Sequence, residues 1–366
     1  MKRALISGML VLVLVVLVVA AACATPAPTP APTATPVPGA TLAPTTPSTP
    51  GKTYKWRAAM FGTEAESPYY AWFAKRLEEA SGERIKVDVL WGGQHPLGVA
   101  DYETAVRDRV FEMGYLSPAY MQTQDLITAA ASLPLITPGA SFAERNALYE
   151  KLRPVLYDPF TDKWNMISLF WAEYGEMALA TKTGPITGFK DLKGLKLRVY
   201  NAVMGQMDTL MGAIPVTLPY EEVYPALQRG IIDGLHMTPP YMYISKLYEV
   251  DRYHVLGLGF FEAVSLGLNK DAFNELPPDL QQVVLDVGKE IEKEARDWME
   301  QQDAVGAVKG VREYGVTLTA ASRSFAAEAY QRMQPLYADF IAKTGDRGAN
   351  NLKAIEQFHK DWLATH

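Results

Sequence analysis

The side chain best suited to recognise a ligand is an arginine at the end of a predicted strand. Leu195–Tyr200 alternates apolar and polar residues, which places Arg198 on the face opposite Leu197 and Val199, near the carboxyl end of the strand. Its planar guanidinium can hold a carboxylate through two parallel charge-assisted hydrogen bonds, a geometry that lysine cannot match. The alternative is that Arg198 pairs with an acidic side chain of its own lobe and only stabilises the sheet.

The sequence lacks the motifs that would indicate catalysis or metal binding. It contains no Gly-x-Ser-x-Gly motif and no phosphate-binding loop, and its five histidines are too scattered for a sequence-local zinc site. We therefore expect no catalytic residue, no cofactor and no bound metal. A secreted enzyme remains the less favoured alternative.

Residues 1–22 have the features of an export signal. Lys2 and Arg3 precede the uncharged apolar run Met9–Ala22, whose 14 residues fall short of the roughly 20 needed to span a bilayer. Cys23 follows three alanines in a setting that resembles the lipobox of bacterial lipoproteins, so we expect it to carry a lipid that anchors the exported chain to the outer face of the cytoplasmic membrane. As the only cysteine it cannot form an internal disulfide. An ordinary secreted protein with a stray cysteine is the alternative.

Residues 23–51 are predicted to be an extended, lipid-anchored linker. Between Ala24 and Gly51 there are nine prolines, eight threonines and no charge, a composition that cannot bury a core. Without Lys2 and Arg3 the chain has 33 basic residues (35 minus 2) against 41 acidic ones, a net charge of −8. This balance argues against a nucleic-acid partner.

The elements that must position Arg198 alternate between helix and strand. A strand at 54–61, a helix at 68–80 and a strand at 85–90 predict a parallel pair of strands. The other expected elements are, in chain order, a helix at 101–109, a strand at 110–116, a helix at 120–131, strands at 177–181 and 195–200, helices at 204–211 and 219–229, a short strand and turn at 231–234, a β-like run at 254–268 and a helix at 278–313.

This order predicts an α/β protein of two discontinuous lobes with a ligand cleft between them. Residues 52–174 begin lobe 1, residues 175–262 form lobe 2, and residues 263–303 return to lobe 1. Residues 304–366 are expected to be long C-terminal helices that pack mainly on lobe 2. Clefts of this kind bind ligands at the carboxyl ends of strands.

Four segments, taken in order, resemble a known family over nearly all of the chain from Ala71 to about Glu313. They are Trp72–Gln94, Glu112–Pro118, Leu192–Val199 and Glu222–Gly234. The chain is similar to the DctP-like substrate-binding subunits of tripartite ATP-independent periplasmic (TRAP) transporters. The resemblance implies a type II-like periplasmic binding protein, expected as a monomer, whose lobes close on a small organic anion and deliver it to TRAP-type membrane permease subunits. A binding protein for an ABC importer or a sensor kinase is the alternative.

The resemblance also assigns expected ligand contacts. It places the family's carboxylate-binding arginine at Arg198 and an aromatic ring at Tyr220, which by itself could equally pack in the core. After Asp233–Gly234 the usual polar contact is missing, because Leu235–Thr238 offers no carboxylate or amide. Met177 stands where many members have a second arginine. We therefore expect a monocarboxylate with an apolar or aromatic body, bound without a cation.

The remaining candidates are wall residues, most of which could equally belong to the core, and one glutamate that could instead cap the first helix. They are Trp171, Met237, His236, Tyr115, Ser117, Met177, Tyr241, Phe261 and the glutamate, Glu64.

Overall fold

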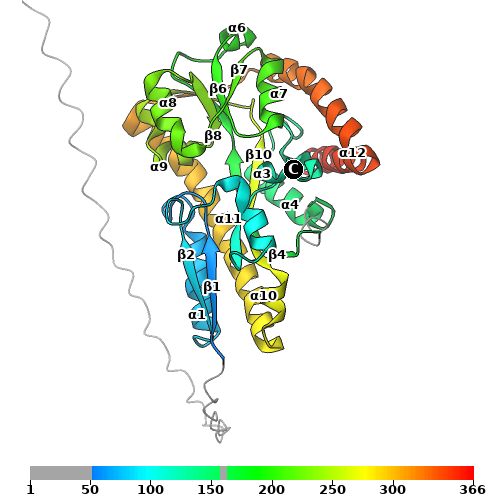
Figure 1. Cartoon of the computed structure of the whole chain (residues 1–366). Coiled ribbons are helices and arrows are strands. Elements are labelled where there is room, and N and C mark those ends of the chain that lie inside the picture. The colour runs from blue at the N-terminus through cyan, green and yellow to red at the C-terminus, as the bar shows by residue number, and fades with distance from the viewer. Residues whose placement is uncertain (1–51, 157–162) are drawn as a thin grey trace, which may run out of the picture. The chain divides into compact units, whose positions relative to one another are not determined.

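The computed structural model describes residues 52–156 and 163–366 (Figure 1). The predicted signal peptide, the predicted lipid attachment at Cys23 and the predicted linker lie outside these residues, so the structure does not test them. Among the helices of the described residues, none combines the length and the apolar character needed to cross a membrane.

The first sheet has five strands in the order β2-β1-β3-β10-β4. β1 pairs with β2 and β3 in parallel, whereas β10 runs antiparallel to β3 and β4. The predicted parallel pair is confirmed. α1 (Tyr69–Ala80) connects its two strands, and apolar residues at helical spacing form the buried face of this helix. The strands are β1 Tyr54–Ala59, β2 Ile85–Leu90, β3 Met113–Leu116, β4 Met166–Glu176 and β10 Phe261–Asn269.

The second sheet has six strands in the order β11-β9-β5-β8-β6-β7. β6 lies between β8 and β7, and all three are parallel, so their carboxyl ends meet at one edge. The strands are β5 Ala178–Thr181, β6 Lys196–Val199, β7 Ile214–Thr217, β8 Gly234–Met237, β9 Tyr253–Leu256 and β11 Thr317–Ala320. The two sheets confirm the predicted α/β fold with discontinuous lobes.

The chain passes between the sheets three times, and the first two passages lie next to each other, whereas the third follows β10 and leads to β11. β4 leads into β5 through Met177, and β9 leads into β10 through residues 257–260. The amide of Met177 donates a hydrogen bond to the carbonyl of Phe260 at 2.9 Å. A Cβ atom at Gly259 would lie 2.0 Å from the Met177 carbonyl oxygen, so only glycine allows the two connections to approach this closely.

Two long helices follow the second passage. α11 (Pro278–Tyr314) packs on α1 and β4 and also on α9 (Pro239–Ile244), which confirms the predicted helix at 278–313 (Figure 1). α12 (Arg323–Thr365), with a kink at Gly345 (φ 64°), packs on α4, α7 and η2. The other helices are η1 Val99–Asp101, α2 Tyr102–Arg107, α3 Pro118–Met121, η2 Leu126–Ser132, α4 Phe142–Leu156, α6 Phe189–Leu192, α7 Ala202–Met211, η3 Tyr220–Glu222, α8 Val223–Arg229, η4 Leu247–Glu249 and α10 Lys270–Asn274.

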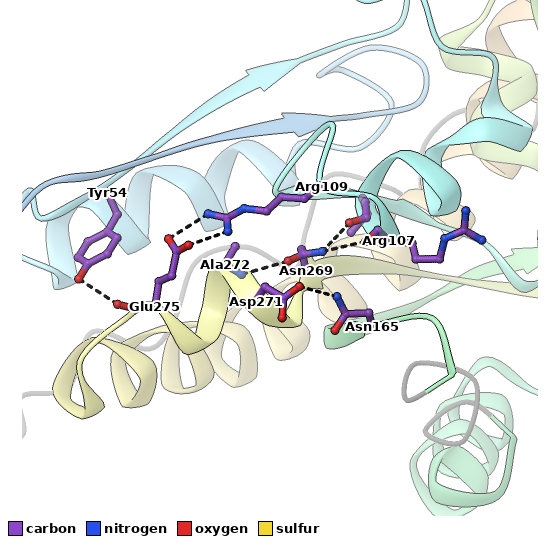
Figure 2. Close-up of polar contacts among 9 residues, drawn as sticks. Tyr54, Arg107, Arg109, Asn165, Asn269, Asp271, Ala272 and Glu275 are labelled. Atoms are coloured by element: carbon purple, nitrogen blue, oxygen red, sulfur yellow. Dashed lines mark hydrogen bonds and ion pairs between the residues drawn. The ribbon is translucent and has the colours of Figure 1, made fainter.

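Polar contacts tie the end of β10 and the helix α10 to the first lobe (Figure 2). The guanidinium of Arg109 forms two hydrogen bonds to the carboxylate of Glu275, at 2.7 and 2.9 Å. The Asn269 amide donates to the backbone carbonyls of Val106 and Arg107 at 2.8 and 3.1 Å. These contacts hold the returning segment against α2 and the residues that follow it.

Two local predictions are wrong. Residues 120–131 do not form one helix, because α3 ends at Met121 and Asp125 starts the separate helix η2 by accepting from the Ile127 amide. The strand expected at 231–234 begins only at Gly234, and Ile231 is 46% exposed. Gly230 ends α8 in the left-handed conformation, and the next residues form the turn into β8.

Candidate functional site

A small cavity of about 30 Å³ lies between the two sheets. Its volume leaves room for roughly two water molecules, so the lobes are closed around it. From the first-sheet side it is lined by Phe61, Tyr115, Tyr120, Tyr174 and Glu262, from the second-sheet side by Met177, Arg198, Tyr200, His236 and Met237, and in addition by Tyr220 and Tyr241.

Arg198 is the only arginine or lysine among the residues that line this cavity. It extends from β6 and is 2% exposed. Its Nε donates to the Leu218 carbonyl at 3.1 Å, and its guanidinium carbon lies 4.7 Å from the centre of the Tyr200 ring. Within the described residues it forms no ion pair with an acidic side chain, so the N–H groups that do not reach Leu218 or the Tyr120 hydroxyl keep their capacity for a carboxylate.

Glu262, on β10, faces the same cavity and is absent from the residues predicted from sequence. It is 5% exposed and accepts a hydrogen bond from the Tyr200 hydroxyl. Burial raises the pKa of its carboxyl to about 7, although Tyr200 and Arg198 oppose the rise. The sequence signal that could have identified Glu262 is its position as the single acidic residue in the otherwise uncharged run Phe261–Asn269.

His236 is held in place from behind the cavity wall. Its Nε2 lies 2.8 Å from Oδ1 of Asp208 on α7, and both side chains are fully buried. This contact orients the imidazole on β8, while Nδ1 has no hydrogen-bond partner among the described residues. The neighbouring Met237 and Met177 contribute apolar wall, in the places where the resemblance suggested polar contacts in other members.

Aromatic rings from both sides complete the walls. Tyr174 and Tyr241 stack with centroids 4.5 Å apart, and Tyr120 and Tyr200 stack at 5.0 Å. Phe61 contacts Tyr115 and Tyr220 at 5.5 and 5.2 Å. Burial raises the pKa of Tyr120 to about 12 although the nearby Arg198 opposes the rise, so at neutral pH this hydroxyl is a neutral donor.

A polar network centred on Glu66 connects the lobes beside the cavity. One carboxylate oxygen of Glu66 accepts from the Tyr220 hydroxyl at 3.1 Å and from the Ser245 hydroxyl at 2.7 Å. The other accepts from the amide and hydroxyl of Thr63 at 2.8 and 3.0 Å. The Tyr241 hydroxyl donates to the Glu66 carbonyl at 2.7 Å.

Four of the residues predicted from sequence lie outside the cavity lining. Trp171 is buried in the core on β4, and Ser117 caps α3 by accepting from the Ala119 amide at 3.3 Å. The Phe261 ring lies 3.8 Å from the guanidinium carbon of Arg145. Glu64 is exposed and makes no capping hydrogen bond to α1. The other seven line the cavity: Arg198, Tyr220, His236, Met237, Tyr115, Met177 and Tyr241.

The described residues contain no group of three or more His, Cys, Asp or Glu side chains that could hold a metal ion. The polar groups of the cavity are instead one guanidinium, one carboxyl, one imidazole and several phenols. Such a set can bind a small organic molecule by hydrogen bonds and charge.

Comparisons with known proteins identify a matching family model and similar chains. Residues 65–344 match the family model described as bacterial extracellular solute-binding protein, family 7. The ectoine/5-hydroxyectoine-binding periplasmic protein UehA of Ruegeria pomeroyi is 28% identical over 320 residues, which cover 83% of this chain and 88% of that protein.

Solved structures share the fold. DctP7 of Bordetella pertussis, an extracytoplasmic solute receptor that binds pyroglutamic acid, superposes with a TM-score of 0.76 at 23% identity over 83% of this chain and 99% of that one. A TRAP periplasmic solute-binding protein of Sulfitobacter with bound β-D-galacturonate gives a TM-score of 0.75 at 22% identity, again over 83% and 99% of the two chains.

Proposed function

Because this chain belongs to family 7 of the bacterial extracellular solute-binding proteins, the DctP family of TRAP systems, we propose that it captures a small monocarboxylate for a TRAP-type permease. The observation that carries the ligand class is Arg198, a buried guanidinium that lines the cavity and has no ion-pair partner among the described residues. A buried charge of this kind is stable only with a partner, and a ligand carboxylate would provide it.

The proposed ligand has an apolar or aromatic body behind its carboxylate. The cavity has a single arginine or lysine, and most of its wall consists of aromatic rings and the two methionines Met177 and Met237. The ligands named for the similar proteins, which include pyroglutamic acid and the polyhydroxylated β-D-galacturonate, support a small carboxylic acid, whereas the apolar or aromatic body rests on the cavity wall alone.

Replacement of Arg198 tests the proposal. We expect Arg198→Ala to weaken binding of the carboxylates found in a thermal-shift screen by about 2 to 5 kcal/mol, because it removes one partner of a buried charge-assisted contact. Isothermal titration calorimetry measures the change. Arg229→Ala, at the exposed end of α8, is the matched control and should bind as the original chain does. Unchanged affinity in Arg198→Ala would contradict the site.

We further propose that Cys23 carries a lipid and that residues 24–51 tether the binding domain to the membrane. The alanines before Cys23 and the uncharged Pro/Thr-rich composition after it support this proposal. Replacing Cys23 by alanine should move the protein from the membrane fraction to the soluble fraction, as followed by immunoblotting. A variant that still sediments with membranes would rule out the lipid anchor.

A further inference from the structure

We propose that Glu262 is a second specificity-determining residue of the cavity, selecting carboxylates that also present a hydrogen-bond donor such as N–H. This inference rests on the proposed function and deepens it. Arg198 and Glu262 line the same cavity from different lobes, one from β6 and the other from β10. A molecule bound in this cavity, whose walls must move apart to admit it, therefore meets both a cation and a hydrogen-bond acceptor.

The hydrogen-bond inventory shows that Glu262 has unused accepting capacity. A carboxylate can accept about four hydrogen bonds, and within the described residues Glu262 accepts one, from Tyr200. It also forms no ion pair within that part of the chain, with Arg198 or with any other basic side chain. A buried carboxyl in this condition is costly unless another donor reaches it, and the cavity is the side from which a donor can come.

Glu66 is a carboxylate whose hydrogen-bond accepting capacity is fully used within the protein. It accepts four hydrogen bonds, from Thr63, Tyr220 and Ser245, and these bonds occupy both of its oxygens. Its oxygens are already occupied, and it lines a neighbouring pocket with Tyr220 and Ser245 instead of this cavity. Glu262 is the acidic residue of the lining, and it is the one with capacity left.

The electrostatic surroundings of Glu262 suit a donor that is neutral or positively charged. Its charged and titratable neighbours are Arg198 and Tyr200 from the β6 segment, Tyr115 from β3 and Tyr120 from α3. Because burial raises its pKa to about 7, a ligand N–H group stabilises the ionised form at little cost near neutral pH. A second carboxylate on the ligand would instead face an acid, so dicarboxylates are disfavoured.

Two matched pairs of probes isolate the donor. Pipecolate carries a ring ammonium that cyclohexanecarboxylate lacks, and 6-oxopiperidine-2-carboxylate carries an N–H that is an oxygen atom in 6-oxotetrahydropyran-2-carboxylate. Affinities are measured by isothermal titration calorimetry on the full chain. We expect the donor-bearing member of at least one pair to bind about tenfold or more tightly, as for a hydrogen bond to a charged group.

Two variants of Glu262 then separate charge from accepting capacity. Glu262→Met should abolish the preference in both pairs, because it removes the acceptor while keeping a side chain of similar size. Glu262→Gln keeps an acceptor and should lose only the preference for the ammonium. Arg229→Ala, at the exposed end of α8 and away from the cavity, is the control and should leave the affinity ratio of each pair as in the original chain.

The outcomes distinguish this inference from the proposed function. Equal binding of both members of each pair, lost together in Arg198→Ala, overturns the role of Glu262 and leaves the carboxylate site in place. A preference that survives Glu262→Met also overturns it. No binding of any probe or of a wider panel of organic acids overturns both.

Discussion

Buried charges in this protein fall into two kinds, paired and unpaired. Arg145 and Glu173 are paired, with two hydrogen bonds of 2.8 and 3.2 Å between a guanidinium and a carboxylate that are both buried. Arg198 and Glu262 line the cavity without such a pair among the described residues. The first kind satisfies itself within the fold, whereas the second kind leaves binding capacity that a solute can use.

Glu103 allows a direct test of how burial changes the pKa of a carboxyl group in this protein. Its side chain on α2 is 1% exposed, and burial raises its pKa to about 8, well above the value of about 4.3 for an unfolded chain. Between these values the folded state holds a proton that the unfolded state has lost. The stability contributed by Glu103 is therefore fully present below pH ~4.3 and is lost as the pH rises to about 8.

We expect Glu103→Gln to remove this loss, because glutamine stays neutral in both states. The substitution should raise the melting temperature by roughly 5 °C more at pH 8 than at pH 5. Differential scanning calorimetry at the two pH values checks this, with the exposed Glu300→Gln as the control. An equal change at both pH values would show that Glu103 does not titrate in this range.

At the scale of elements, the Glu66 network joins the loop before α1 to η3 and to the end of α9. Glu66→Gln replaces a carboxylate oxygen with an amide group that cannot accept, so at least one of the part-buried hydrogen bonds from Thr63, Tyr220 and Ser245 is lost. The cost is about 1 to 3 kcal/mol, and it falls on the closed arrangement of the lobes. We expect the ligand-free variant to have a larger radius of gyration in small-angle X-ray scattering.

Glu64→Gln provides the matched control for this experiment, because Glu64 lies two residues away and is exposed. Its scattering curve should match that of the original chain. Identical curves for Glu66→Gln and the original chain would mean that the network does not hold the lobes together.

Elements with strong periodicity could be predicted from sequence, and elements defined by their neighbours could not. α1 and β2 lie within one residue of their predicted bounds, because local spacing alone specifies them. No strand was predicted where β4 lies, since Met166–Glu176 is almost wholly buried and shows no alternation. The start of β8 at Gly234 depends on a partner strand, because a Cβ there would lie 2.2 Å from the Ala180 carbonyl oxygen.

At the scale of the whole molecule, the same distinction applies to the candidate site. Arg198 could be selected from strand alternation and from the family resemblance, and it lines the cavity. Glu262 could not, because only the return of the chain from β9 to β10 brings it into the same cavity as Arg198. Likewise, spacing cannot distinguish Glu64 from Glu66, two residues apart in one loop, although one is exposed and the other connects the lobes.

The near-complete enclosure of Arg198 has a consequence for the speed of uptake. A solute can contact a guanidinium that is 2% exposed only while the lobes are open. At low solute concentration the rate of binding is limited by how often solute and protein meet. At high concentration it is limited by the rate at which the lobes open. Release of the solute needs the same opening. A permease that stabilises the open conformation would therefore accelerate release without contacting the solute.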